Sequence, residues 1–256
     1  MKSKVLIRKL FKMFPTKIAK KYHDFVGKMT VPLKEETNKV LICLDVSKAV
    51  CDYAIKNDVD LIISHHPFIY GKKKYVLLDP LKNQLYNELV NHNIPVYSFH
   101  TNFDEGIGGM NDALANALNL IMIDEINNCP LGRCGYLIEE MDVYDFAKYA
   151  LKCLNIDYGQ LIAEGNKLIS KVGIIGGAGS REYHYAYEDG CDIYISGDTP
   201  YHIRREIIDK KLNYLHLDHE IEKIFITRMK DIISNIDSSL EIIEFDDVKQ
   251  PSLIIK

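Results

Sequence analysis

The chain has 256 residues, of which 47% are apolar, and a formal net charge of −4 at pH 7. This length and composition bury a large core in one large domain or two smaller ones, and the weak acidity does not favour an obligate nucleic-acid or anionic-membrane binder. No apolar run reaches the roughly 18 residues that span a bilayer, and the N-terminal stretch lacks the apolar core of a signal peptide, so we expect a cytoplasmic protein without membrane contacts.

The first predicted element is a basic amphipathic helix within Lys2–Lys21. This segment holds eight basic and no acidic residues, and Leu6, Leu10, Phe11 and Phe14 are interleaved with them. The pattern predicts a helix with one apolar and one cationic face.

Strand-like runs and helical stretches then alternate through the first half of the chain. The strand-like runs are Val40–Leu44, Leu61–Ser64 and Pro95–Phe99, and the helical stretches are Lys48–Asn57, Leu81–Asn91 and Ala113–Leu120, with Asn111 as the expected N-cap of the last. This alternation is typical of βαβ units, so the first half predicts one α/β layer.

Residues 129–215 show the same alternation with their own set of elements. Strands are predicted at Gly135–Ile138, Gln160–Ala163, Val172–Ile175 and Ile193–Ser196, and helices at Tyr144–Leu154, Tyr183–Glu188 and His202–Lys210. The predicted fold class is therefore α/β with a second α/β unit. No fixed-period repeat relates the two units.

Two adjacent imidazoles, His65 and His66, directly follow the apolar run Leu61–Ser64. Strand ends are where α/β proteins place their chemistry. Neighbouring side chains of a strand point to opposite faces, so the two rings share one site only if the chain turns there, and Pro67 favours such a turn. For the pair alone, a structural interpretation is equally good, in which one histidine caps the strand and the other is exposed to solvent.

Two further strand-like runs supply partners for these imidazoles. One leads directly to His100 and Asp104, and another, later in the chain, leads to His219 and Glu222, which stand three residues apart on one helical face. Imidazoles and carboxylates from three strand ends are the ligands expected for two borderline divalent cations. The six cysteines lie outside these clusters and show no C-x-x-C spacing, so we expect reduced thiols and no closed structural zinc site.

These segments, in this order, resemble the NIF-three-like family of dinuclear-metal-centre hexameric proteins, whose members are named GTP cyclohydrolase I type 2 homologues. The resemblance covers nearly the whole chain. Its specific motifs are Ser-His-His-Pro at 64–67, His-Thr-Asn-Phe-Asp at 100–104 followed by Gly106, Gly108 and Gly109, Ser-Gly-Asp at 196–198 with His202, and His-x-x-Glu at 219–222.

The resemblance implies that five residues hold two divalent ions, which would be zinc, manganese or iron, with one carboxylate bridging them. These residues are His65, His66, Asp104, His219 and Glu222. Many members of the family place the glutamate four residues after the histidine. Asp218 with Glu222, and His216 with Glu220, are therefore alternatives to the last pair. A second departure is near the N-terminus, where the family commonly has Asp-Asn-Val-Gly-Leu and this chain reads His23-Asp24-Phe25-Val26-Gly27-Lys28, without the asparagine.

The resemblance also implies a homo-hexamer and two domains with helix-flanked mixed sheets. The C-terminal stretch would return to complete the first, metal-binding domain. This gives a discontinuous domain of residues 1–125 plus 216–256 and a second α/β domain of residues 126–215. Because the family begins with similar helices, we expect the basic N-terminal helix to pack on the core.

The implied function is that of a hydrolase that opens the ring of a purine nucleotide, as GTP cyclohydrolase does. His100 and His202 are the candidate catalytic groups, and Asp45 and His100 are candidates for orienting the metal ligands. Two other classes stay open. One is a hexameric metal-binding interaction or regulatory protein without turnover, and the other is a metal-dependent phosphoesterase acting on nucleotides or nucleic acid.

Two further motifs allow a structural and a functional interpretation. The glycine-rich turn at 173–180 follows a strand and precedes a helix, as phosphate-binding turns do, but it lacks the lysine and the spacing of a P-loop. Close packing of strand and helix is therefore favoured there. The lysines at 72–74 either attract an anionic substrate or form a solvated loop, and the solvated loop is favoured.

Overall fold

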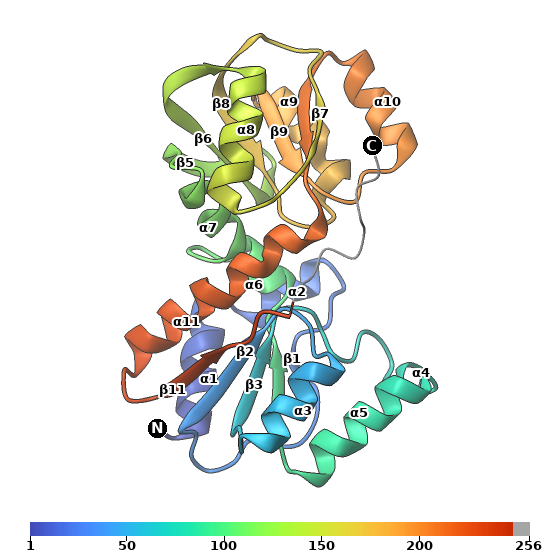
Figure 1. Ribbon diagram of the computed structural model, residues 1–256, viewed down its shortest axis with the longest axis vertical. Coiled ribbons are helices and arrows are strands. Elements are labelled where there is room, and N and C mark those ends of the chain that lie inside the picture. The colour runs from blue at the N-terminus through green and yellow to red at the C-terminus, as the bar shows by residue number, and fades with distance from the viewer. Residues whose placement is uncertain (248–256) are drawn as a thin grey trace. The chain divides into compact units, whose positions relative to one another are not determined.

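The computed structural model describes residues 1–247, and the chain divides into two compact units (Figure 1). Unit 1 holds Met1–Ile107 together with the stretch from Phe225 onward, and unit 2 holds Gly108–Ile224. Unit 1 is thus discontinuous. The limits of both units differ from those that the resemblance implied. The expected first domain was residues 1–125 plus 216–256, and the expected second domain was residues 126–215. Within the described residues, no helix combines the length and the apolar character that crossing a membrane requires.

Unit 1 is built on a five-stranded sheet in the order β1-β4-β3-β2-β11. The strands are β1 (Gly27–Lys28), β2 (Lys39–Cys43), β3 (Leu61–Ser64), β4 (Val96–Ser98) and β11 (Glu241–Glu244). Neighbours pair in parallel except β1 and β4, which are antiparallel. Every residue of β3 is buried. Helices cover both faces of such a strand, which explains why the sequence shows a continuous apolar run there.

Seven helices belong to or end in unit 1 within the described residues. They are α1 (Ser3–Met13), α2 (Thr16–Lys21), α3 (Lys48–Lys56), α4 (Lys73–Val76), α5 (Pro80–Asn91), α6 (Thr101–Glu105) and α11 (Ile224–Ile236). Side-chain caps fix where two of them start, because Ser47 accepts from the Val50 amide before α3 and Asp79 accepts from the Lys82 amide before α5. In Figure 1, α3 and α5 lie to one side of the sheet and α1 and α11 to the other.

The basic N-terminal segment packs on the core, as expected. Helix α1 buries Leu6, Ile7 and Leu10, and Phe14 packs on Phe103 with ring centroids 4.7 Å apart. All eight basic residues of the segment are exposed. The apolar face of the helix therefore belongs to the fold, and the cationic face remains open to solvent.

Unit 2 is built on a six-stranded sheet in the order β5-β6-β8-β9-β10-β7. The strands are β5 (Ile121–Ile126), β6 (Cys129–Asp142), β7 (Gln160–Ile162), β8 (Leu168–Ile174), β9 (Ile193–Ser196) and β10 (Asn213–His216). Strands β8, β9 and β10 are parallel, and the other pairs are antiparallel. Strand β5 was not predicted, because most of its side chains are exposed and it does not read as a core strand.

The helical elements of unit 2 explain the shifted boundaries. They are α7 (Met110–Ala117), α8 (Val143–Leu154), α9 (Tyr183–Glu188), α10 (Tyr201–Asp209) and the 3-10 turns η1 (Gly179–Glu182) and η2 (His219–Lys223). Helix α7 contacts β6 and β8, and η2 follows β10 after two residues, so both segments belong to unit 2. The expected first domain, residues 1–125 plus 216–256, includes both segments.

The expectation that Asn111 caps α7 is wrong. Gly109 occupies the N-cap position, and Asn111 lies inside the helix. Its Oδ1 accepts from the Gly176 amide at 2.8 Å, and its Nδ2 donates to the Leu131 carbonyl at 2.8 Å. Asn111 therefore anchors the glycine-rich turn instead of a helix start.

Both sheets are mixed and flanked by helices, as the sequence predicted. In unit 1 four neighbouring strands run in parallel, namely β4, β3, β2 and β11, and in unit 2 three do, namely β8, β9 and β10. Parallel strands bring their carboxyl ends to one edge of the sheet, where ligands of α/β proteins commonly bind. All six cysteines are free, as expected.

Candidate metal centre

His65 and His66 continue from the end of β3. The His65 amide donates to the Cys43 carbonyl at 3.2 Å and the His66 amide to the Leu44 carbonyl at 3.0 Å, so both residues still lie beside the end of β2. The Ser64 hydroxyl donates to the His66 carbonyl at 2.9 Å and closes a local turn. The two imidazole centroids are 5.0 Å apart as a result. The turn that a shared site requires is therefore present.

Strand β4 brings a third imidazole to the same edge. The His100 ring centroid lies 5.2 Å from that of His65 and 5.7 Å from that of His66. Each of the three rings offers one ligand nitrogen, and these atoms lie within 4.8 Å of one another. Asp104, buried on α6, has its Oδ1 3.5 Å from Nε2 of His65. We call His65, His66, His100 and Asp104 the unit 1 cluster.

Every imidazole of the unit 1 cluster has its Nδ1 held by an oxygen acceptor. The partners are the Phe99 carbonyl for His65 at 2.8 Å, Asp45 for His66 at 2.9 Å and Asp24 for His100 at 2.7 Å. Such a bond places the proton of the neutral ring on Nδ1 and directs the Nε2 lone pair toward a cation. Metal-binding histidines are usually oriented in this way.

The two carboxylates behind these rings are stabilised in their ionised form. Burial alone would raise their pKa values, but the hydrogen bond and charge of His66 hold the pKa of Asp45 below its usual value. The hydrogen bond and charge of His100, together with a bond from Thr101, do the same for the pKa of Asp24. The resulting negative charges make the imidazoles better ligands for a cation.

A second cluster lies at the carboxyl ends of β9 and β10. His219 and Glu222 occupy positions i and i+3 of η2, and 3-10 winding stacks such side chains on one side. Nε2 of His219 lies 3.1 Å from Oε2 of Glu222, and its Nδ1 lies 2.7 Å from Oδ2 of Asp198. We call Asp198, His219 and Glu222 the unit 2 cluster.

The unit 2 cluster attracts positive charge. The hydrogen bond from His219 to Glu222 outweighs the effect of burial and, together with Asp198, raises the pKa of His219 to about 9. A metal ion would compete with this proton for the same atoms, since a ligand histidine must bind in its neutral form.

The glycine-rich turn after β8 makes room for Glu222. Gly177 has φ +60°, and a Cβ at this position would lie 2.1 Å from Oε1 of Glu222 and 3.1 Å from Nε2 of His219. Any side chain would therefore displace the carboxylate. The sequence suggested close strand–helix packing or a phosphate cradle, whereas the structure shows that the missing Cβ clears space for a candidate metal ligand.

The alternative pairings at the end of β10 do not form a cluster. Nδ1 of His216 lies 2.7 Å from Oγ1 of Thr199, and its Nε2 lies 3.7 Å from Oδ1 of Asp218. Asp218 in turn accepts from the Tyr158 hydroxyl. Within residues 1–247, none of the His/carboxylate groups of metal-binding type includes His216, Asp218 or Glu220.

His202, expected as a catalytic group, is exposed on α10. Over the part of the chain that the structure describes, its ring makes no hydrogen bond or ion pair and belongs to no group of metal-binding type. The catalytic role of His202 therefore stays a prediction.

Nearly the whole chain matches the model of a protein family. The match to Duf34/NIF3 (NGG1p interacting factor 3) spans residues 1–251. The chain belongs to the Duf34/NIF3 family. This confirms the resemblance seen in the motifs.

Curated relatives within the family carry the name GTP cyclohydrolase 1 type 2 homolog. The chain is 28% identical to that of Clostridium perfringens over 236 residues, which cover 89% of this chain and 90% of the relative. It is 30% identical to that of Streptococcus pneumoniae over 219 residues, which cover 82% of each.

Solved structures show the same fold. The structure of a Bacillus cereus protein related to NIF3 matches with a TM-score of 0.88 at 20% identity and covers 100% of this chain and 99% of that one. A Staphylococcus aureus protein matches with a TM-score of 0.88 at 24% identity and the same coverage. At these identities the likeness establishes the Duf34/NIF3 fold and nothing about chemistry.

The sequence did not assign a role to two carboxylates that bind histidines of the clusters, Asp24 and Asp198. Asp198 directly follows β9 within the Ser-Gly-Asp motif, so its place at a strand end was a usable signal. Asp24 gave no such signal, since it lies 76 residues before its partner His100 and follows no predicted strand. Both are carboxylates that orient histidines in this Duf34/NIF3 chain.

We expect Asp198→Asn to weaken divalent-metal binding by about 10–100-fold, the usual loss when a residue that orients a metal ligand is changed. The amide keeps the shape of the side chain but removes the charge next to His219. Titration against a chromophoric chelator measures the affinity. Asp209→Asn, an exposed position on α10, is the control and should bind as the unchanged protein does. Equal affinities for both variants would contradict the role given to Asp198.

Proposed function

We propose that this Duf34/NIF3 protein is a metal-dependent hydrolase that holds two divalent ions. The proposed ligands are His65, His66, Asp104, His219 and Glu222. The observation that carries the proposal is that Nδ1 of each of these histidines is bound by a carbonyl or carboxylate oxygen, which leaves Nε2 as the ligand atom. Nitrogen and oxygen donors without thiolates suit zinc, manganese or iron.

The residues present fit such ions. Gly177 leaves the space that the Glu222 carboxylate occupies. The pKa of His219 is raised to about 9, which indicates a site that favours positive charge. When bound, divalent ions at sites of this kind activate water and polarise the group that the water attacks.

His100 is the group that we assign to proton transfer. Its Nδ1 is bound to Asp24 at 2.7 Å, and its ring stands next to those of His65 and His66. The Asp24 carboxylate stabilises the imidazolium that forms when Nε2 takes up a proton, as the carboxylate of a Ser-His-Asp triad does. His100 can then return this proton to a leaving nitrogen.

The substrate that we propose is GTP. Relatives from Clostridium perfringens and Streptococcus pneumoniae are named GTP cyclohydrolase 1 type 2 homologs, which supports a purine nucleotide as substrate. In this reaction, water adds to the carbon between the two nitrogens of the imidazole ring. A C–N bond then breaks, and a second hydrolysis releases that carbon as formate.

The test is formate release from GTP by protein supplied with zinc, manganese or iron(II), with phosphate release followed in parallel. We expect formate from the unchanged protein and a loss of about 100-fold or more in His100→Ala, with metal content unchanged. Phosphate without formate would replace this proposal by a phosphoesterase. If the protein binds metal but releases neither formate nor phosphate, the hydrolase proposal is wrong and the protein binds metal without turnover.

We also propose that the protein is a homo-hexamer. The support is the resemblance to the hexameric proteins of the family. Light scattering on the purified protein should give six times the mass of the chain, and a monomer or dimer mass would contradict the proposal.

A further inference from the structure

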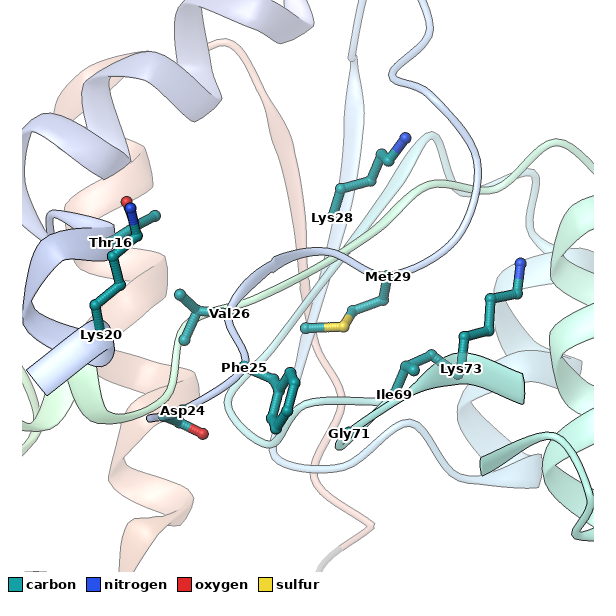
Figure 2. Close-up of a pocket in the computed structure, with 10 residues that line it drawn as sticks. All are labelled: Thr16, Lys20, Asp24, Phe25, Val26, Lys28, Met29, Ile69, Gly71 and Lys73. Atoms are coloured by element: carbon teal, nitrogen blue, oxygen red, sulfur yellow. The ribbon is translucent and has the colours of Figure 1, made fainter. Parts of the chain in front are cut away.

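Unit 1 contains a pocket of about 340 Å³ that none of the proposed metal ligands lines (Figure 2). Its lining comes from α2, from the segment that leads into β1, from β1 itself and from residues 69–73 after the His-His pair. The volume falls within the usual range of small-molecule sites. The side chains around it indicate what kind of molecule it binds.

Three lysines line the pocket. Lys20, Lys28 and Lys73 reach it from three separate segments (Figure 2). Within residues 1–247 neither Lys20 nor Lys28 has an ion-pair partner, whereas Lys73 donates to the Tyr86 hydroxyl. The exposed basic residues of α1 and α2 add to the positive potential, although the chain as a whole is acidic. Lysines without an ion-pair partner attract an anion, and phosphates match lysines well.

Phe25 gives the pocket a flat apolar surface. Its side chain is 40% exposed, and its ring stands edge-on to that of Tyr70, with centroids 5.3 Å apart. Exposed aromatic rings of this kind stack on nucleobases. Phe25 belongs to the element in which this chain lacks the asparagine common in the family, so this surface is a property of the chain itself.

Asp24 joins the pocket to the unit 1 cluster. Its Oδ2 binds His100, while its Oδ1 is buried and has no hydrogen-bond partner within the described residues. The side chain is only 3% exposed. A buried carboxylate oxygen without a donor is unfavourable, so a donor from outside the chain would stabilise it. In Figure 2, Asp24 lies well apart from the Lys28 ammonium.

We propose that this pocket binds a nucleotide. Its phosphates contact Lys20 and Lys28, its base stacks on Phe25, and an N–H group of the base meets Asp24. This orientation brings the base toward His100 and leaves the phosphates at the lysines. The inference rests on the proposed function only in identifying the nucleotide as the substrate, because binding itself requires neither metal nor turnover.

The test is calorimetric titration of the metal-free protein with GTP, inorganic triphosphate and guanosine. We expect the double variant Lys20→Ala/Lys28→Ala to weaken the binding of GTP and of triphosphate by at least about tenfold, which is the effect of losing a charge-assisted hydrogen bond. Phe25→Ala should weaken the binding of GTP and of guanosine by about tenfold but leave the affinity for triphosphate unchanged. The matched control is Lys4→Ala/Lys12→Ala, which removes two exposed lysines of α1 that do not line the pocket.

Each other outcome overturns the inference. Equal losses in the two lysine pairs would mean that the basic face attracts anions without a specific pocket. An unchanged GTP affinity in Phe25→Ala would reduce the site to phosphate alone, and tighter binding of a single-stranded oligonucleotide than of GTP would mean a nucleic-acid surface. Failure of the hydrolase proposal gives a different result. GTP then still binds, and its binding depends on Lys20, Lys28 and Phe25, but no formate is released.

Discussion

We expect His65→Ala combined with Glu222→Ala to lower the metal content of the purified protein from the proposed two divalent ions per chain to none. The double variant removes one proposed ligand from each cluster. His65 is fully buried and Glu222 is 4% exposed. Solvent therefore cannot easily supply a replacement donor at either position. Elemental mass spectrometry of protein purified without added metal, and again after reloading with zinc, manganese or iron(II), measures the effect.

The control for this experiment is His92→Ala combined with Glu139→Ala, which changes the same residue types at exposed positions. Circular dichroism establishes that the variants fold, and His66→Ala, at a partly exposed ring, is the substitute if the buried change disrupts unit 1. Retention of both ions by a folded double variant would contradict the ligand set. Loss of both ions in the control as well would mean that metal content reports stability and not ligation.

We expect Gly177→Ala to weaken metal binding strongly while leaving most of the fold intact. The new Cβ would lie 2.1 Å from Oε1 of Glu222, so the carboxylate must leave its place beside His219. The backbone cost is separate, since φ +60° is a left-handed conformation that costs a residue with a Cβ about 1–2 kcal/mol. We expect a loss of stability of this size in urea unfolding and a loss of metal affinity of about 100-fold or more, since a ligand is displaced outright.

Gly190→Ala separates these two effects. Gly190 belongs to the same unit and has φ +71°, but a Cβ there would meet no atom within 4 Å. This variant should lose similar stability and keep its metal. If Gly177→Ala also keeps its metal, the clearance at the turn has no part in placing Glu222. If both variants lose their metal, backbone strain alone explains the loss of metal.

The sequence by itself determined the fold class and the elements that carry the clusters. The buried parallel strands read as short apolar runs because helices cover both of their faces, which is why β2, β3 and β4 were predicted nearly at their observed limits. His65 and His66 follow β3 directly, so their place at the edge of the sheet is fixed by covalent connection. The spacing of the motifs was enough to indicate the Duf34/NIF3 family.

Only the tertiary structure decided which side chains meet. Asp24 reaches His100 across 76 residues, a pairing that no local pattern encodes. The selection of His219 over His216 depends on η2, whose 3-10 winding aligns positions i and i+3, and on Thr199, which binds His216 from another loop. The role of Gly177 is likewise invisible in the sequence. A glycine shows where a Cβ is absent, but only the folded chain shows that the carboxylate of Glu222 needs the space.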